Sequence, residues 1–348
     1  MKNYYESRFA VLNKTGKPLL IKNLKIPKLE NNQLLVKIKY SYICGTQMNE
    51  ISGSKGVDKY LPHTLGHEAS GYIVDLGPNV KKFKVGEKVI LSWIKKKESS
   101  SVNPFYFDEK NKKINSGLVS TFSNLTVVSK DRVYKIPRDL PMDIAALFGC
   151  ALPTGFGIVF NFLKKISKNN YIGVYGVGGV GVMAFIALKT LGIKNIYAVD
   201  KNKKNLQIVR KLGCKFVGNP KEIEKKIINK LIDKKNIKYN FEMSGHKIMM
   251  EAAIKNLSYN GTMVLAGNTR KGDFIRLNPY DLIFGKKIFG FSGNDVSLEK
   301  NIKNYVKIIR KINLKKLRSI FSVYKFKNIN KAIRDFKKGT VLRPLIKF

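Results

Sequence analysis

The glycine-rich run Gly176-Val177-Gly178-Gly179-Val180-Gly181 constrains the fold more than any other feature of this sequence. It follows the short apolar segment Tyr171–Tyr175, which predicts a strand, and leads into Val180–Leu191, whose apolar spacing predicts a buried helix. A G-x-G-x-x-G run between a strand and a helix is typical of domains that bind a dinucleotide. The sequence therefore predicts a parallel, doubly wound α/β sheet around this run.

Each residue of the run has a physical reason to be there. Gly176 permits a tight turn, Gly178 lets the backbone approach the cofactor pyrophosphate, and Gly181 allows the helix to pack closely on the sheet. Gly179 and Val180 open the helix, where unpaired N–H groups and the positive end of the dipole favour an anion. We expect these residues to bind the pyrophosphate.

An acidic residue follows the next predicted strand, Asn195–Val199. Asp200 lies about 20 residues after the glycines, where a carboxylate binds the ribose hydroxyls of NAD and repels the 2′-phosphate of NADP. Lys201, Lys203 and Lys204 come next, and their charges soften this preference. We expect Asp200 and Lys201 to contact the cofactor, and NAD to be favoured over NADP.

The pattern of the chain changes near residue 151, which predicts two domains. Residues 1–151 contain short alternating segments separated by turn residues, as in a β-rich domain. Residues 152–294 alternate strands and helices, and a closing strand at Val341–Ile346 indicates that residues 295–348 return to the first domain. The polar segment Lys95–Gly117 is expected to form a surface loop. The predicted strands of the first domain include Gln33–Tyr40, Ala69–Leu76 and Lys88–Trp93.

The chain is strongly basic, with 66 Lys and Arg residues against 24 Asp and Glu residues and a net charge of +42. The lysines are spread along the whole sequence, whereas nucleic-acid-binding proteins more often concentrate them on one motif or tail. General enrichment in lysine and asparagine therefore explains the charge best, and we expect no specific nucleic-acid partner. A small anionic substrate is the second explanation.

The three cysteines, Cys44, Cys150 and Cys214, do not form a disulfide framework in a chain of 348 residues, which favours a reducing cytoplasm. The least polar run, Tyr171–Leu188, is interrupted by glycines and reads poorly as a membrane span. Met1–Val11 carries charges and lacks the apolar core of a secretory signal. We expect a cytoplasmic protein.

Cys44, His67 and Cys150 form a second constellation. Two thiolates and one imidazole can hold zinc and leave its fourth position for water or substrate, as catalytic zinc sites do. Each residue alone has a simpler explanation, since buried cysteines and hydrogen-bonded histidines are common in protein cores. The segments that flank the three residues favour a zinc site over these simpler explanations.

Three segments around these residues, together with the glycine run, resemble the zinc-containing medium-chain alcohol dehydrogenases: Cys44-Gly45-Thr46, Gly66-His67-Glu68 and Gly149-Cys150-Ala151-Leu152-Pro153-Thr154-Gly155. The similarity covers nearly the whole chain. It implies an N-terminal GroES-like β-barrel domain, an inserted doubly wound Rossmann domain, and a homodimer or homotetramer. A cysteine at position 150 favours the alcohol dehydrogenase branch over the polyol dehydrogenases, and the stretch is similar to glutathione-dependent formaldehyde dehydrogenases.

The resemblance implies the same three zinc ligands and roles for four further residues. Thr46 matches the hydroxyl residue that hydrogen-bonds the alcohol oxygen and passes on its proton. Glu68 matches a carboxylate behind the metal. Thr154 matches a residue near the nicotinamide, and Arg343 resembles a late arginine that reaches the cofactor pyrophosphate.

The sequence also departs from this family. Ser92–Ser120 contains none of the four cysteines that bind a structural zinc in many members, so we expect one catalytic zinc and a remodelled lobe. Gln47 replaces a frequent aspartate, and Asn49 replaces a proton-relay histidine that could titrate near neutrality. His63 is a relay candidate only by proximity and is expected at the surface. Cys214 is expected to be a packing residue.

These features predict a zinc-dependent oxidoreductase that transfers a hydride between an alcohol and its aldehyde or ketone and NAD(H). A zinc-free, NAD(P)H-dependent quinone or carbonyl reductase of the same fold is the first alternative, because it keeps the glycine run without needing three metal ligands. An anion- or nucleic-acid-binding protein on a dehydrogenase scaffold is the second, and the basic charge motivates it.

Overall fold

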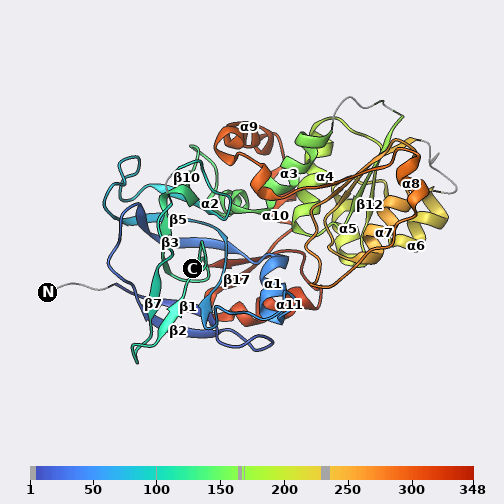
Figure 1. Ribbon diagram of the computed structural model, residues 1–348. Coiled ribbons are helices and arrows are strands. Elements are labelled where there is room, and N and C mark those ends of the chain that lie inside the picture. Colours follow the sequence, from blue (N-terminus) through green and yellow to red (C-terminus); the bar gives the residue numbers. More distant parts are fainter. Residues whose placement is uncertain (1–4, 99, 164–166, 168, 229–235) are drawn as a thin grey trace. The chain divides into compact units, whose positions relative to one another are not determined.

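The computed structural model describes residues 5–98, 100–163, 167, 169–228 and 236–348 (Figure 1). The chain forms two compact units. The first contains residues 1–150, 297–307 and 321–348, and the second contains residues 151–296 and 308–320. The C-terminal segment thus returns to the first unit, although residues 308–320 of that segment cluster with the second.

The first unit is built from two sheets. One sheet is a closed barrel with the strand order β1-β2-β7-β8-β4. The strand order of the other is β10-β6-β5-β3-β18-β17, and β9 also pairs with β3. The strands of the barrel are β1 (Glu6–Leu12), β2 (Leu20–Lys25), β7 (Phe105–Phe107), β8 (Lys113–Asn115) and β4 (His63–Thr64). Those of the second sheet are β10 (Val133–Lys135), β6 (Lys88–Ser92), β5 (Glu68–Leu76), β3 (Gln33–Tyr42), β18 (Pro344–Lys347), β17 (Ser322–Lys325) and β9 (Leu125–Ser129).

The closing strand holds the C-terminus in this unit. β18 pairs antiparallel with β3, with Leu345 opposite Tyr42. Nearby helices complete the unit: α1 (Gly45–Ser52), α2 (Met142–Ala145), η2 (Ala146–Gly149), α9 (Leu298–Arg310, whose last turn belongs to the second unit) and α11 (Ile329–Lys337). The apolar face of α11, with Ile329 and Ala332, packs in one core cluster with Leu12 and Ile43.

The expectation that Lys95–Gly117 is a surface loop is wrong for its second half. β7 and β8 form an antiparallel hairpin within the barrel, and Tyr106 and Ile114 are fully buried. The Tyr106 hydroxyl accepts a hydrogen bond from the Val127 N–H at 3.0 Å, so the hairpin contributes to the barrel core. Each strand has only three residues, which is too short for alternation to stand out in the sequence.

The second unit contains a parallel sheet of six strands in the order β13-β12-β11-β14-β15-β16. This is the strand order 3-2-1-4-5-6 of dinucleotide-binding sheets. The sheet confirms the expected doubly wound Rossmann fold. Its strands are β11 (Tyr171–Tyr175), β12 (Ile196–Val199), β13 (Phe216–Gly218), β14 (Ile237–Glu242), β15 (Thr262–Leu265) and β16 (Lys287–Gly290).

Helices cover this sheet (Figure 1). The longer ones are α3 (Ala151–Phe162), α4 (Gly179–Thr190), α5 (Lys203–Lys211) and α7 (Lys247–Lys255), and the short helices are α6 (Pro220–Glu222), η3 (Ile223–Ile228), α8 (Pro279–Ile283), η5 (Gly293–Asp295) and α10 (Leu314–Arg318). The strand order reverses between β11 and β14, so the crevice for a ligand is expected at the carboxyl ends of these two strands.

Among the described residues, no single helix is both long and apolar enough to cross a membrane. One bent pair, Met142–Gly149 with Ala151–Phe162, has the length and composition only when taken together, and most of its side chains are buried.

Candidate functional site

Four side chains of the first unit converge on one point. Cys44, His67, Glu68 and Cys150 each offer a ligand atom, and these atoms all lie within 4.8 Å of one another. Cys44 is the N-cap of α1, His67 directly precedes β5, Glu68 is the first residue of β5, and Cys150 follows η2. The structure therefore brings together the three residues that were expected to bind zinc, with Glu68 beside them.

The glycines of these motifs allow the approach. Gly66 has φ +97°, and a Cβ there would lie 2.4 Å from Thr121 Oγ1. At Gly149, a Cβ would lie 2.6 Å from the Cβ of Glu68. A larger residue at Gly66 would displace the segment of His67 from Thr121, and one at Gly149 would push the segments of Cys150 and Glu68 apart.

The chemistry of the cluster fits a metal ion. The Nε2 atom of His67 is buried and has no hydrogen-bond partner among the described residues, which leaves a lone pair or proton with nothing to satisfy it. The Cys44 thiol forms a hydrogen bond with Cys150 and lies near the imidazole of His67. Both hold the pKa of Cys44 well below its usual value despite burial. The same hydrogen bond and burial raise the pKa of Cys150. Two sulfurs and one nitrogen are a donor set that zinc prefers.

Arg343 lies against the cluster of proposed metal ligands. Its side chain is 2 % exposed, its guanidinium forms an ion pair with the fully buried carboxylate of Glu68, and it lies 5.1 Å from the ring centroid of Tyr42. The described partner of Arg343 is thus a carboxylate beside the metal cluster, and its contact with a cofactor pyrophosphate stays a prediction. A buried carboxylate needs such a cation to remain charged, which explains the pairing.

Helix α1 carries the other expected residues of this site. Thr46 is half-buried in its first turn, two residues after Cys44, and Asn49 is half-buried further along. Gln47 is buried and contacts both Cys44 and His67, a double contact that the sequence alone did not reveal. His63 is half-buried rather than at the surface, and its ring nitrogens contact Asp58 Oδ2 at 2.8 Å and Thr64 O at 3.0 Å.

Lys96 connects the start of the polar lobe after β6 to residues outside the lobe. The ammonium of Lys96 is largely buried and lies 5.2 Å from the ring centroid of Phe83 and 5.0 Å from that of Tyr134. The Lys96 N–H also donates to Asp131 O at 2.9 Å. These cation–π contacts fasten the start of the lobe to Phe83 before β6 and to Tyr134 of β10.

In the second unit, the glycine run forms the expected turn between β11 and α4. Gly176 has φ +82°, and a Cβ there would lie 2.5 Å from the backbone nitrogen of Ser244. At Gly181 it would lie 1.9 Å from the carbonyl oxygen of Gly176. No described atom lies within 4 Å of a Cβ placed at Gly178, the N-cap of α4. The loop is therefore packed on its inner side and open at the residue expected to face a pyrophosphate.

Asp200 lies directly after β12 and beside this loop. One carboxylate oxygen accepts hydrogen bonds from the Val177 N–H at 2.9 Å and from Asn205 Nδ2 at 3.3 Å, and the other accepts from the Asn202 N–H at 2.8 Å. Lys201 points instead to His246, whose Nε2 lies 2.6 Å from the Lys201 Nζ. The acidic and basic residues thus lie at the end of the same strand.

Two more positions complete this region. Thr154 is buried in α3, as a residue of the second unit. The carboxylate of Glu242, at the end of β14, accepts hydrogen bonds from both the N–H and the hydroxyl of Ser244, and burial raises its pKa to about 7. Sequence reasoning missed Glu242 and Ser244, although a Ser-Gly pair directly after a buried strand could have indicated the carboxyl edge of the sheet.

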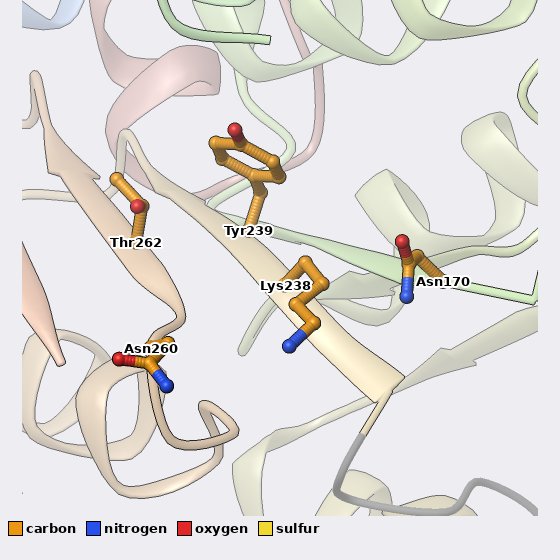
Figure 2. Close-up of a pocket in the computed structure, with 5 residues that line it drawn as sticks. All are labelled: Asn170, Lys238, Tyr239, Asn260 and Thr262. Carbon is orange, nitrogen blue, oxygen red and sulfur yellow. The ribbon is translucent and has the colours of Figure 1, made fainter. Parts of the chain in front are cut away.

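Figure 2 shows a small polar pocket lined by Asn170, Lys238, Tyr239, Asn260 and Thr262. These residues lie at or near the amino ends of β11, β14 and β15. Because dinucleotides bind at the carboxyl ends of such strands, this pocket lies at the wrong edge of the sheet for the cofactor.

Family comparisons cover both units. Residues 30–138 match the alcohol dehydrogenase GroES-like domain, and residues 179–311 match the zinc-binding dehydrogenase domain. The chain is 27 % identical to S-(hydroxymethyl)glutathione dehydrogenase of Saccharomyces cerevisiae, covering 97 % of this chain and 95 % of that protein. It is 28 % identical to alcohol dehydrogenase class-2 isozyme 2 of Oryctolagus cuniculus, covering 97 % and 96 %. The crystal structure of benzyl alcohol dehydrogenase from Acinetobacter calcoaceticus is similar with a TM-score of 0.86, 25 % identity and 99 % coverage of each chain.

Proposed function

Because this chain belongs to the zinc-containing medium-chain alcohol dehydrogenase family, we propose that it transfers a hydride between an alcohol, or the matching aldehyde or ketone, and NAD(H) at a single zinc ion. The observation that carries this proposal is the buried cluster of Cys44, His67 and Cys150 with the unsatisfied Nε2 of His67. A zinc-free reductase of this fold would have no reason to bury these three donors together.

Each residue of the site has a separate role in the proposed hydride transfer. Zinc bound by Cys44, His67 and Cys150 supplies a Lewis acid that stabilises negative charge on the substrate oxygen. The hydroxyl of Thr46 accepts the alcohol proton, and Glu68, neutralised by Arg343, supports the cluster from behind. Asn49 has no group that titrates near neutrality, so this position cannot carry the proton onward. The loop of Gly176, Gly178, Gly179, Val180 and Gly181 would hold the cofactor pyrophosphate, and Thr154 would contact the nicotinamide.

Zinc content and cofactor binding test this proposal together. The protein is purified without added metal, zinc per subunit is measured by elemental analysis, and NADH binding is followed by fluorescence. We expect about one zinc per subunit, NADH binding and alcohol oxidation, as three protein ligands imply. NADH binding without zinc, in a protein that still reduces quinones, would transfer the assignment to the zinc-free reductases.

We also propose that the substrate is anionic. The net charge of +42 attracts anions, and a relative at 27 % identity is named for a glutathione adduct, which carries carboxylates. Carboxylated or thiol-adduct alcohols are expected to have a higher kcat/KM than neutral alcohols of similar size, with the advantage shrinking as salt is raised. A neutral alcohol that exceeds every anionic candidate would disprove this preference.

NAD is the proposed cofactor, and Asp200 is its proposed determinant. Replacing Asp200 with asparagine keeps an acceptor for the Val177 N–H but removes the charge that repels a 2′-phosphate. The ratio of kcat/KM for NAD to that for NADP is expected to fall at least about tenfold, equivalent to about 1.4 kcal/mol. Lys201→Ala is the matched control, because removing a cation should raise the same ratio. An unchanged ratio in Asp200→Asn would remove Asp200 from this role.

A homodimer through the edge of the second unit is the proposed assembly. β16 is the last strand of its sheet, and exposed apolar side chains surround it: Tyr259, Tyr280, Ile283, Phe284 and Phe289. An open edge with apolar neighbours can pair with the same edge of a second copy about a two-fold axis.

Ile283→Asp tests this interface, since Ile283 is 72 % exposed in the single chain and would place two carboxylates across a two-fold contact. We expect a dimer to become a monomer in light scattering. Val57→Asp is the control, because Val57 is 92 % exposed in the first unit and its replacement should leave the mass unchanged.

The reducing cytoplasm remains the proposed location, because Cys44 and Cys150 must stay unoxidised to bind zinc.

A further inference from the structure

Gln47 connects two zinc-ligand residues through one side chain. It is 1 % exposed and lies in the first turn of α1. Its Oε1 accepts a hydrogen bond from the Cys44 N–H at 2.9 Å, and its Nε2 contacts the Nδ1 of His67. The amide therefore couples the backbone of one ligand to the ring of another.

The number of donors and acceptors fixes the proton on His67. The backbone N–H of Cys44 can only donate, so it requires the single oxygen of the Gln47 amide. The amide nitrogen, which can also only donate, is then left for Nδ1 of His67. Nδ1 must accept this hydrogen bond, so the ring proton of a neutral His67 lies on Nε2.

Zinc binding requires the opposite arrangement. Nε2 is the ring atom that is buried without a partner, whereas Nδ1 is occupied by Gln47, so Nε2 is the atom available to the metal. A neutral histidine that binds metal through Nε2 carries its proton on Nδ1 and needs an acceptor there. If the Gln47 amide turns to offer its oxygen to Nδ1, its NH₂ group faces the Cys44 N–H. In either orientation one donor is opposed to another.

We propose that Gln47 is a positioning residue that lowers the affinity of this site for zinc and makes the ion exchangeable. The inference rests on the proposed zinc site and concerns how tightly that site binds. A carboxylate at this position would satisfy both donors, because it has two accepting oxygens. Since partners behind a metal-binding histidine change metal affinity by about 10- to 100-fold, the amide is expected to have an effect of this size.

Gln47→Glu is the sharpest test, because glutamate has the same length and shape as glutamine. Zinc affinity is measured in the purified protein by competition with a chromophoric chelator. The dissociation constant for zinc is expected to fall about 10- to 100-fold in Gln47→Glu. Asn49→Asp is the charge control. It adds a carboxylate to the same helix at a residue other than the one that contacts His67, and should change the constant less than about threefold by charge alone.

The tautomer of His67 gives a second measurement that needs no variant. The chain has only three histidines, so a ¹⁵N-histidine NMR spectrum of the zinc-free protein can be assigned. We expect His67 to carry its proton on Nε2 without zinc and on Nδ1 with zinc. Equal zinc affinities of wild type and Gln47→Glu, or a proton on Nδ1 in the zinc-free wild type, would overturn the inference. If neither protein binds zinc, the proposed function itself fails.

Discussion

Replacing Cys44 with serine is expected to leave a folded protein that contains almost no zinc and has lost at least about three orders of magnitude in kcat/KM. Cys44 provides one of the three proposed donors in a cluster whose ligand atoms lie within 4.8 Å of one another, and the hydrogen bond with Cys150 lowers the pKa of its thiol. A serine hydroxyl stays protonated near neutral pH and is a poor zinc ligand. Elemental analysis and steady-state kinetics on the same preparation measure both losses.

Cys214→Ser is the matched control for this prediction. The Cys214 thiol is buried in the second unit and contacts the carbonyl oxygens of Ile196 and Phe216, at 3.6 Å and 3.4 Å. Burial raises its pKa to about 12, so it remains a thiol, and a serine hydroxyl can donate to the same carbonyls. Zinc content should be unchanged. If Cys44→Ser kept both zinc and activity, the ligand assignment would be wrong.

The central strands β11 and β12 of the parallel sheet were predictable from the sequence because they are buried on both faces. Such strands appear as continuous apolar runs between turn residues, and the predicted strand Tyr171–Tyr175 has the bounds of β11. In the first unit, the predicted strands agree with β3, β5 and β6 to within a few residues. The three-residue strands β7 and β8 gave no such signal.

The partners of individual side chains were harder to predict than their grouping. The spacing of motifs indicated that Cys44, His67 and Cys150 act together, but not that Glu68 would meet Arg343, 275 positions further on. Arg343 enters this cluster because β18 pairs with β3, and β3 leads to Cys44. Gln47 presents the same difficulty, since its two contacts depend on the turn between β3 and α1. Side-chain burial and the pairing of distant strands decide such contacts, and neither can be read from a single sequence.

The cofactor loop gives the second large effect, and Gly178 is the position that isolates it. No described atom would contact a Cβ at Gly178, and its φ of −72° is accessible to alanine. Gly178→Ala is therefore expected to keep the melting temperature and zinc content of the wild type. The added methyl occupies space meant for the pyrophosphate, so the Kd for NADH should rise at least about tenfold, or about 1.4 kcal/mol.

Gly181→Ala separates this contact from the integrity of the loop. Its Cβ would lie 1.9 Å from the carbonyl oxygen of Gly176, so the loop must move before any ligand binds. We expect Gly181→Ala to lose both NADH affinity and thermal stability, whereas Gly178→Ala loses affinity alone. Isothermal titration with NADH and thermal unfolding of both variants give the comparison. If Gly178→Ala bound NADH as tightly as the wild type, the pyrophosphate would have to lie away from the N-terminus of α4, and the cofactor assignment of this loop would fall with it.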